Sequence, residues 1–225
     1  LGSSQREQVL GALAAAYVAL GNPGRGAEFA RERLEQARAR GNATAVIEAQ
    51  VGLAEALLHV PGREDEAATH ARAALRNCAG LAGTISWDIR ALLVLAELAL
   101  RAGDANAALD HASAAASRIE ARETPLVWLV TYAAWVQGLA LEAAGRREDA
   151  RSWFERAYEH VENTAEHLTS DELREIYLRD GFCVAAIRDA AARYGVGRAS
   201  APAAEPTDRL AGLTPRELEV LSLVA

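Results

Sequence analysis

The feature that most constrains this chain is a glycine that recurs after 41, 41 and 42 residues. A small residue follows each of these glycines five positions later. The four pairs are Gly21 and Gly26, Gly62 and Ala67, Gly103 and Ala108, and Gly145 and Ala150. A glycine readily adopts the left-handed conformation that ends a helix, and a small residue lets the next helix approach closely. The pattern therefore predicts four helix-turn-helix units.

The helix after each turn carries an apolar stripe. Its residues are spaced by four and then three positions, which places them on one face of the helix. The matched sets are Ala67, Ala71 and Ala74, then Ala108, Ala112 and Ala115, then Ala150, Phe154 and Ala157. One helix pair cannot cover its own stripe, so neighbouring pairs have to stack. We therefore expect an all-α fold, an α-solenoid of helical hairpins in which Phe154 is structural.

Apolar periodicity and turn residues together predict the individual helices. The expected ranges are 4–20, 23–40, 43–60, 63–79, 84–102, 105–121, 124–144, 147–162 and 169–194. The first eight form about four pairs, and the last is expected to cap the array as a single unpaired helix. Thr169 or Ser170 can cap the start of that helix, where Asp171 and Glu172 meet the positive end of its dipole.

These units resemble the tetratricopeptide repeat. The fourth unit matches best, with Gly138 in its first helix, Gly145 at the turn, and then Ala150, Phe154 and Ala157. The spacing departs from the usual period of about 34 residues, and the extra residues lie mostly between units. The resemblance implies that residues 1–194 form one repeat domain, with the first helix of each pair on a concave face and the second helix outside.

A different composition begins after residue 194. Residues 195–212 include two prolines and show no apolar periodicity, which indicates a flexible linker. In the segment that follows, Thr214 can cap a helix, Pro215 suits its first turn, and Glu217 completes a capping box. Residues 213–225 resemble the opening of the LuxR-type helix-turn-helix domain, and we expect them to be its truncated start.

The combination of helical repeats with this tail resembles the large ATP-binding LuxR-family transcription regulators. In that family an ATP-hydrolysing module precedes the repeats, and the repeats receive an inducer or an inhibitory partner. The resemblance implies a segment of a longer protein that controls an attached DNA-binding domain. DNA would be contacted only through a recognition helix that lies beyond Ala225. A stand-alone helical-repeat scaffold for protein–protein interaction is the alternative, and the presence or absence of that helix separates the two.

Composition and charge argue against other classes of function. The formal net charge is −7, with arginine and glutamate interspersed, whereas phosphate recognition needs a positive patch. The chain has no lysine, so it lacks a Walker-type phosphate loop. Its histidines lack metal-ligand spacing, and Cys78 and Cys183 are interpreted as ordinary buried thiols. We therefore expect no enzymatic activity, cofactor or metal in this segment. With no signal peptide and no apolar run of about 20 residues, a cytoplasmic protein is expected.

The candidate binding surface is the concave face that the resemblance implies. The repeat register selects the following charged and aromatic residues of the first helices as groove-facing: Glu48, Glu55, His59, Arg90, Glu97, Arg101, Tyr132, Trp135 and Glu142. Val51, Leu93 and Leu139 are the apolar members of the same register. The expected partner is a protein, a peptide or a small-molecule inducer, and assembly into a homo-oligomer stays open. Because large aromatics usually bury, core packing is an equal alternative for Tyr132 and Trp135.

Overall fold

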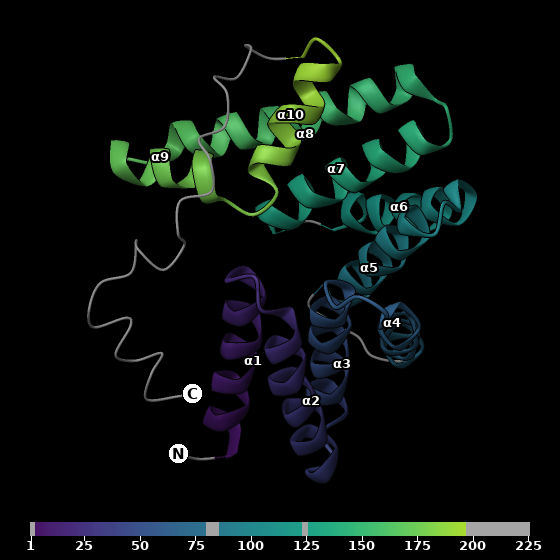
Figure 1. The fold of residues 1–225 in the computed structure, drawn as a ribbon, viewed down its shortest axis with the longest axis vertical. Helices are drawn as coiled ribbons and strands as arrows, with labels where there is room; N and C mark the ends of the chain where they lie inside the picture. The colour runs from purple at the N-terminus through teal and green to yellow at the C-terminus, as the bar shows by residue number, and fades with distance from the viewer. Residues whose placement is uncertain (1–2, 80–85, 123–125, 197–225) are drawn as a thin grey trace.

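The computed structural model describes residues 3–79, 86–122 and 126–196, and within these ranges it contains helices and no strand. Residues 197–225, with most of the predicted linker and the LuxR-like segment, lie outside the described residues. The helices are α1 (Ser3–Ala19), α2 (Pro23–Ala39), α3 (Ala43–Leu58), α4 (Glu64–Cys78), α5 (Trp87–Arg101), α6 (Ala105–Glu120), α7 (Val127–Ala143), α8 (Arg147–His167), α9 (Asp171–Asp180) and α10 (Val184–Arg193). They succeed one another along a curve (Figure 1), which confirms the predicted all-α solenoid.

Of the described helices, α1 to α8 pack as four consecutive hairpins. In each hairpin the two helices contact each other: α1 with α2, α3 with α4, α5 with α6 and α7 with α8. The first helices of neighbouring hairpins also contact one another, because α1 touches α3, α3 touches α5 and α5 touches α7. The first helices therefore form one continuous layer.

The turns form as their sequence predicted. Gly21, Gly62, Gly103 and Gly145 have φ between 74° and 78°, a left-handed conformation that ends the first helix of each unit. A polar cap then starts the second helix in two of these units. The Asn22 side chain accepts a hydrogen bond from the Arg25 amide, and Asp104 accepts one from Ala107.

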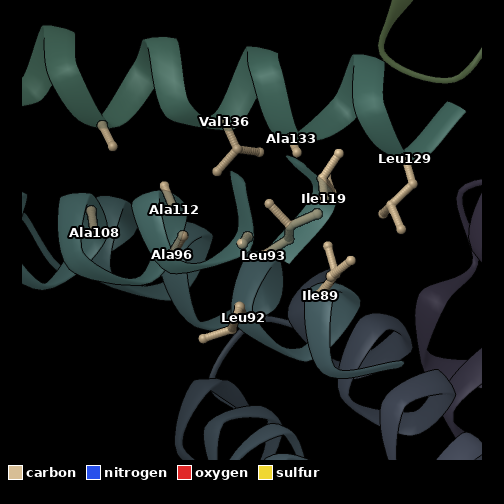
Figure 2. Packing of buried hydrophobic residues seen from close by; sticks show 12 residues of the cluster. Ile89, Leu92, Leu93, Ala96, Ala108, Ala112, Ile119, Leu129, Ala133 and Val136 are labelled. Carbon is tan, nitrogen blue, oxygen red and sulfur yellow. The ribbon is translucent and has the colours of Figure 1, made fainter. Parts of the chain in front are cut away.

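The predicted stripes form the core. All nine residues of the three matched sets have an exposed fraction of 0%. Each stripe is covered partly by the neighbouring unit: Ala108 and Ala112 of α6 belong to a cluster that also contains residues of α5 and α7. Figure 2 shows this cluster, with Leu129 and Val136 of α7 packed over α5 and α6. Stacking between units therefore buries the alanine faces, as a solenoid requires.

Within the fourth unit, the Phe154 ring of α8 lies directly over Gly138 of α7. A Cβ atom placed on Gly138 would lie 2.6 Å from Cε1 of the Phe154 ring. We expect Gly138→Ala to reduce the free energy of unfolding by about 1–2 kcal/mol, because the ring has to move off its packed position. Urea denaturation would measure the change. Gly24→Ala is the control, since nothing lies within 4 Å of a Cβ at that helical position. Equal stabilities for the two variants would contradict this packing.

The prediction of one unpaired helix over residues 169–194 was wrong. The chain instead forms α9 and α10, separated by a turn in which Cys183 has a φ of 62°. Val184 and Ile187 of α10 are buried against α8, so the turn folds this apolar stripe back onto the array. A straight helix would have left the stripe in water. The expected cap is present, because the Ser170 hydroxyl oxygen accepts a hydrogen bond from the Leu173 amide.

Candidate functional site

The concave side of the array contains a cavity of about 400 Å³. The first helices of all four hairpins contribute to its lining, together with α2 and the turn between α9 and α10. Small and aliphatic residues form most of the wall: Gly11, Ala14, Ala15, Val18 and Ala19 of α1, Ala30 of α2, Ala49, Gly52, Ala56 and Leu58 of α3, and Val94 of α5. Such a concave, mostly apolar site with a few polar groups is typical of binding sites for small organic ligands.

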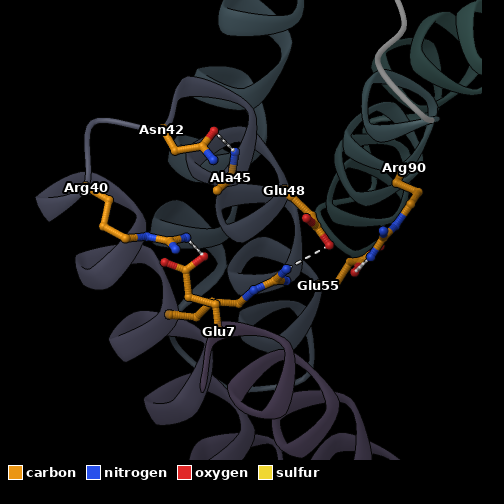
Figure 3. Close-up of polar contacts among 8 residues, drawn as sticks. Glu7, Arg40, Asn42, Ala45, Glu48, Glu55 and Arg90 are labelled. Carbon is orange, nitrogen blue, oxygen red and sulfur yellow. Dashed lines mark hydrogen bonds and ion pairs between the residues drawn. The ribbon is translucent and has the colours of Figure 1, made fainter. Parts of the chain in front are cut away.

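Arg33 brings a positive charge to this wall from α2. A Cβ atom on Gly11 would lie 3.0 Å from Nη1 of Arg33, and a Cβ on Gly52 would lie 4.0 Å from the same atom. The guanidinium therefore lies between α1 and α3, where two glycines leave room for it. It forms an ion pair with Glu48 of α3 at 2.7 Å, and the Arg33 side chain is only 14% exposed. Figure 3 shows Glu48 in this pair.

Arg90 and Glu55 form a second ion pair, which joins α5 to α3 (Figure 3). Nε of Arg90 donates a hydrogen bond to Oε1 of Glu55 at 2.7 Å, and Nη2 donates another to Oε2. Two parallel bonds of this kind fix the geometry of both side chains. Both residues line the cavity. The pair therefore holds a guanidinium in place at the boundary between the second and third units.

His59 lies beside this pair, at the C-terminal end of α3. Burial lowers the pKa of its imidazole, and the positive charge of Arg101 lowers the pKa further. The ring is therefore neutral at pH 7, with one nitrogen that donates a hydrogen bond and one that accepts.

Three aromatic residues line the cavity at its α7 end: Trp128 and Tyr132 of α7, and Phe182 from the turn between α9 and α10. The rings of Tyr132 and Phe182 meet edge to face, with centroids 5.0 Å apart. Phe182 is nonetheless 64% exposed. An exposed phenylalanine beside an apolar cavity is a group that a ligand could cover.

Four of the nine residues that the repeat register selects line this cavity: Glu55, His59, Arg90 and Tyr132. Glu48 acts indirectly, because it holds Arg33. Their role in binding stays a prediction, but the structure brings them together around one space.

Glu97 and Arg101 lie on the next turns of α5 and do not line the cavity. Arg101 donates a hydrogen bond to the backbone oxygen of Leu58, and its guanidinium is 3.9 Å from the Glu97 carboxylate. Burial raises the pKa of Glu97 to about 7 against the opposing influence of Arg101, and the charge of Glu55 raises it further. Glu97 is therefore a largely buried carboxyl group, 15% exposed, whose pKa lies near neutral pH.

Trp135 and Glu142 occupy positions that α10 and the core partly cover. Trp135 is partly buried and packs against the core clusters of the third and fourth units. Glu142 accepts a hydrogen bond from the Tyr194 hydroxyl at 2.9 Å and pairs with Arg193 at 3.4 Å. Folding α10 back onto the array therefore places its C-terminal end over this part of the predicted groove.

Sequence reasoning missed the α1 wall, Arg33, Trp128 and Phe182. The first unit matches the repeat poorly, so the register was not applied to α1. Phe182 lies outside the repeats, in a turn that the predicted straight helix did not contain. Arg33 belongs to a second helix, and its guanidinium reaches the cavity beside Gly11, where a Cβ atom would lie 3.0 Å from Nη1. The repeat register places the second helices outside the concave face, so it gave no signal for Arg33.

No described helix is long and apolar enough to cross a membrane. The described histidine, cysteine and carboxylate side chains form no group of three that could hold a metal ion. Comparison of the sequence with models of known protein families and with curated proteins finds no match.

Proposed function

We propose that the helical repeats form the sensor domain of a transcription regulator, which binds an inducer in the concave cavity and thereby controls a LuxR-type DNA-binding domain. The observation that carries the proposal is the cavity itself, because the first helices of all four hairpins line it. The LuxR-like residues 213–225 are what connect a sensor of this kind to transcription.

A ligand in this cavity would act on the curvature of the array. It would touch α1, α3, α5 and α7 at once, and those helices belong to different stacked units. A ligand shifts a conformational equilibrium by its difference in affinity for the two states. The contacts between ligand and protein would span all four hairpins. A more closed arrangement of the hairpins would therefore make more contacts with the ligand than a more open one.

The turn that contains Phe182 connects the wall of the cavity to the C-terminal part of the chain. Phe182 lines the cavity, and α10 begins two residues later. The predicted linker follows α10 directly, at Gly195. A ligand that packs against Phe182 would therefore bias the position of the last helix before the DNA-binding domain. This linkage is the proposed mechanism of control.

Gly52→Leu tests the proposal. Gly52 lines the cavity in the middle of α3, and a Cβ there meets nothing closer than Arg33 Nη1 at 4.0 Å. The leucine side chain would occupy the ligand space, while the loss of a mid-helix glycine would favour α3 by up to about 1 kcal/mol. We expect a fold stability equal to or above that of the wild type, and a change of about tenfold or more in occupancy of the regulated promoters.

Promoter occupancy would be measured in cells by chromatin immunoprecipitation of the protein with its complete DNA-binding domain. Gly24→Leu is the matched control, because it replaces a helical glycine in open space on α2. It should leave occupancy unchanged. If the wild-type protein occupied no promoters, or if both leucine variants behaved like the wild type, the sensor function would be refuted.

A stand-alone interaction scaffold is the second candidate function. The observation that favours it is the surface of α9, which contributes no buried residue and exposes Leu173 and Ile176. Exposed apolar residues of this kind can form part of a protein contact. A protein that occupies no promoters, but loses a stable partner when Leu173 and Ile176 are changed to serine, would support the scaffold.

A further inference from the structure

We infer that the cavity selects an organic anion, a carboxylate carried on a compact aromatic body. This inference rests on the proposed function, since it names the class of inducer that the same cavity would take.

Two guanidinium groups line the cavity, and each is paired with one carboxylate, Arg33 with Glu48 and Arg90 with Glu55. Arg33 and Arg90 are cationic and Glu55 is anionic, while burial keeps His59 neutral at pH 7 by lowering its pKa. Glu48, which pairs with Arg33, is 40% exposed and does not itself line the cavity. An apolar ligand that covered these pairs would bury the remaining guanidinium N–H donors without acceptors, which is costly. A carboxylate on the ligand would accept hydrogen bonds from those donors.

Both guanidinium groups keep donors for such an anion. A guanidinium has five N–H donors, and Glu55 takes its hydrogen bonds from Nε and Nη2 of Arg90. No described residue accepts a hydrogen bond from Nη1 of Arg90. In Arg33 the Nη2 atom pairs with Glu48, and Nη1 lies beside Gly11 and Gly52, which line the cavity. The carboxylates thus hold the two arginines in place without using all their donors.

The rest of the wall fits an aromatic body. Glycine and alanine of α1 and α3 leave flat surfaces against which a ring can pack. Trp128, Tyr132 and Phe182 supply aromatic faces and edges at the other end. A volume of about 400 Å³ holds a bicyclic aromatic acid. Tyr132 and Phe182 already meet edge to face at 5.0 Å, a geometry that a third ring could extend.

A matched pair of probes tests this inference: 2-naphthoate, and 2-naphthylmethanol with the same rings and no charge. Calorimetric titration of each into the full 225-residue chain at pH 7.5 gives the two affinities. We expect the carboxylate to bind about tenfold more tightly or better, since charge-assisted hydrogen bonds to guanidinium are roughly twice as strong as neutral ones. Gly52→Leu should weaken both probes, because it fills the space that they share.

Arg90→Gln should weaken 2-naphthoate about tenfold and change the affinity for 2-naphthylmethanol less than about twofold. Arg118→Gln is the matched control: Arg118 also pairs across helices, with Asp88 at 3.0 Å, but lies outside the cavity. It should change neither affinity. Thermal denaturation of each variant establishes that it folds.

Three outcomes would overturn the inference: equal affinity for the acid and the alcohol, an Arg90→Gln variant that binds both like the wild type, or no binding of either probe. The first would leave the cavity as a site for neutral ligands, the second would show that Arg90 does not select the anion, and in both cases the sensor function would stand. Loss of the sensor function is decided separately, by promoter occupancy in the Gly52→Leu variant. The two failures can therefore be told apart.

Discussion

Phe154→Ala should reduce the free energy of unfolding by about 3–5 kcal/mol, the usual cost of truncating a fully buried phenylalanine. The ring is 0% exposed and packs with Leu141, Ala150 and Ala190. Its neighbours come from α7, α8 and α10, so the ring joins the fourth hairpin to α10. Alanine would leave a cavity that no neighbouring helix could fill without breaking its own contacts.

Thermal and urea denaturation of the purified chain would measure this change. In a protein of this size the thermal midpoint should fall by roughly 6–20 °C. Phe182→Ala is the control, because it makes the same phenylalanine-to-alanine change at a position that is 64% exposed. It should cost less than about 1 kcal/mol. An unchanged midpoint in Phe154→Ala would mean that the repeat register placing Phe154 between the helices is wrong.

Combining Phe154→Ala with Gly138→Ala tests whether the two residues are in direct contact. Gly138 leaves the space into which the Phe154 ring projects. Once the ring is removed, the methyl group of Gly138→Ala no longer meets it, and a methyl in that space replaces part of the lost packing. We therefore expect Gly138→Ala to destabilise the wild type but to stabilise the Phe154→Ala variant. A change of sign of this kind measures direct contact between the two residues.

The fold could be read from the sequence because its determinants are local and repeated. A glycine that ends one helix and a small residue five positions later specify a hairpin, and three equivalent stripes then specify how hairpins stack. The break between α9 and α10 could not be read in the same way. Helical periodicity continues across Gly181. The chain nevertheless turns there, because Val184 and Ile187 pack against residues of α8 that lie more than twenty positions earlier in the sequence.

The candidate site was predictable only where it follows the repeat. Glu55, Arg90 and Tyr132 occupy register positions, and the structure places them around one cavity. Arg33 and Phe182 reach that cavity by other routes, between two glycines and from a turn outside the repeats. The repeat register also does not predict that the end of α10 covers Glu142. That contact joins Glu142 to Arg193 and Tyr194, which lie 51 and 52 positions later in the sequence.

Glu97→Gln should change how stability depends on pH. The Glu97 carboxyl group is 15% exposed, and its only described ion-pair partner, Arg101, is 3.9 Å away. The charge of Glu55 on α3 opposes its ionisation. Cys183 from the turn before α10 also lies in its neighbourhood, where burial, and then the charge of Glu97, raise the pKa of the thiol. Burial is the largest cause that holds the pKa of Glu97 at about 7, against 4.5 for an ordinary glutamate.

The direction of the effect follows from this raised pKa. Below pH 4.5 the carboxyl group is protonated in both the folded and the unfolded chain, and Glu97 adds no pH dependence. Between pH 4.5 and about pH 7 the unfolded chain releases its proton while the folded chain retains it, so stability falls as pH rises. The loss is complete above pH 7 and amounts to about 3 kcal/mol, since one pKa unit corresponds to about 1.4 kcal/mol.

Glutamine keeps the shape of the protonated carboxyl group and does not ionise. Glu97→Gln should therefore match the wild type in stability at pH 4.5 and exceed it by about 3 kcal/mol at pH 8. Urea denaturation at half-unit steps of pH would measure both profiles. Glu175→Gln removes a charge from an exposed position on α9 and should reproduce the wild-type profile. If Glu97→Gln and the wild type ran parallel from pH 4.5 to 8, Glu97 would have to ionise at the same pH in the folded and the unfolded chain, and burial would not raise its pKa.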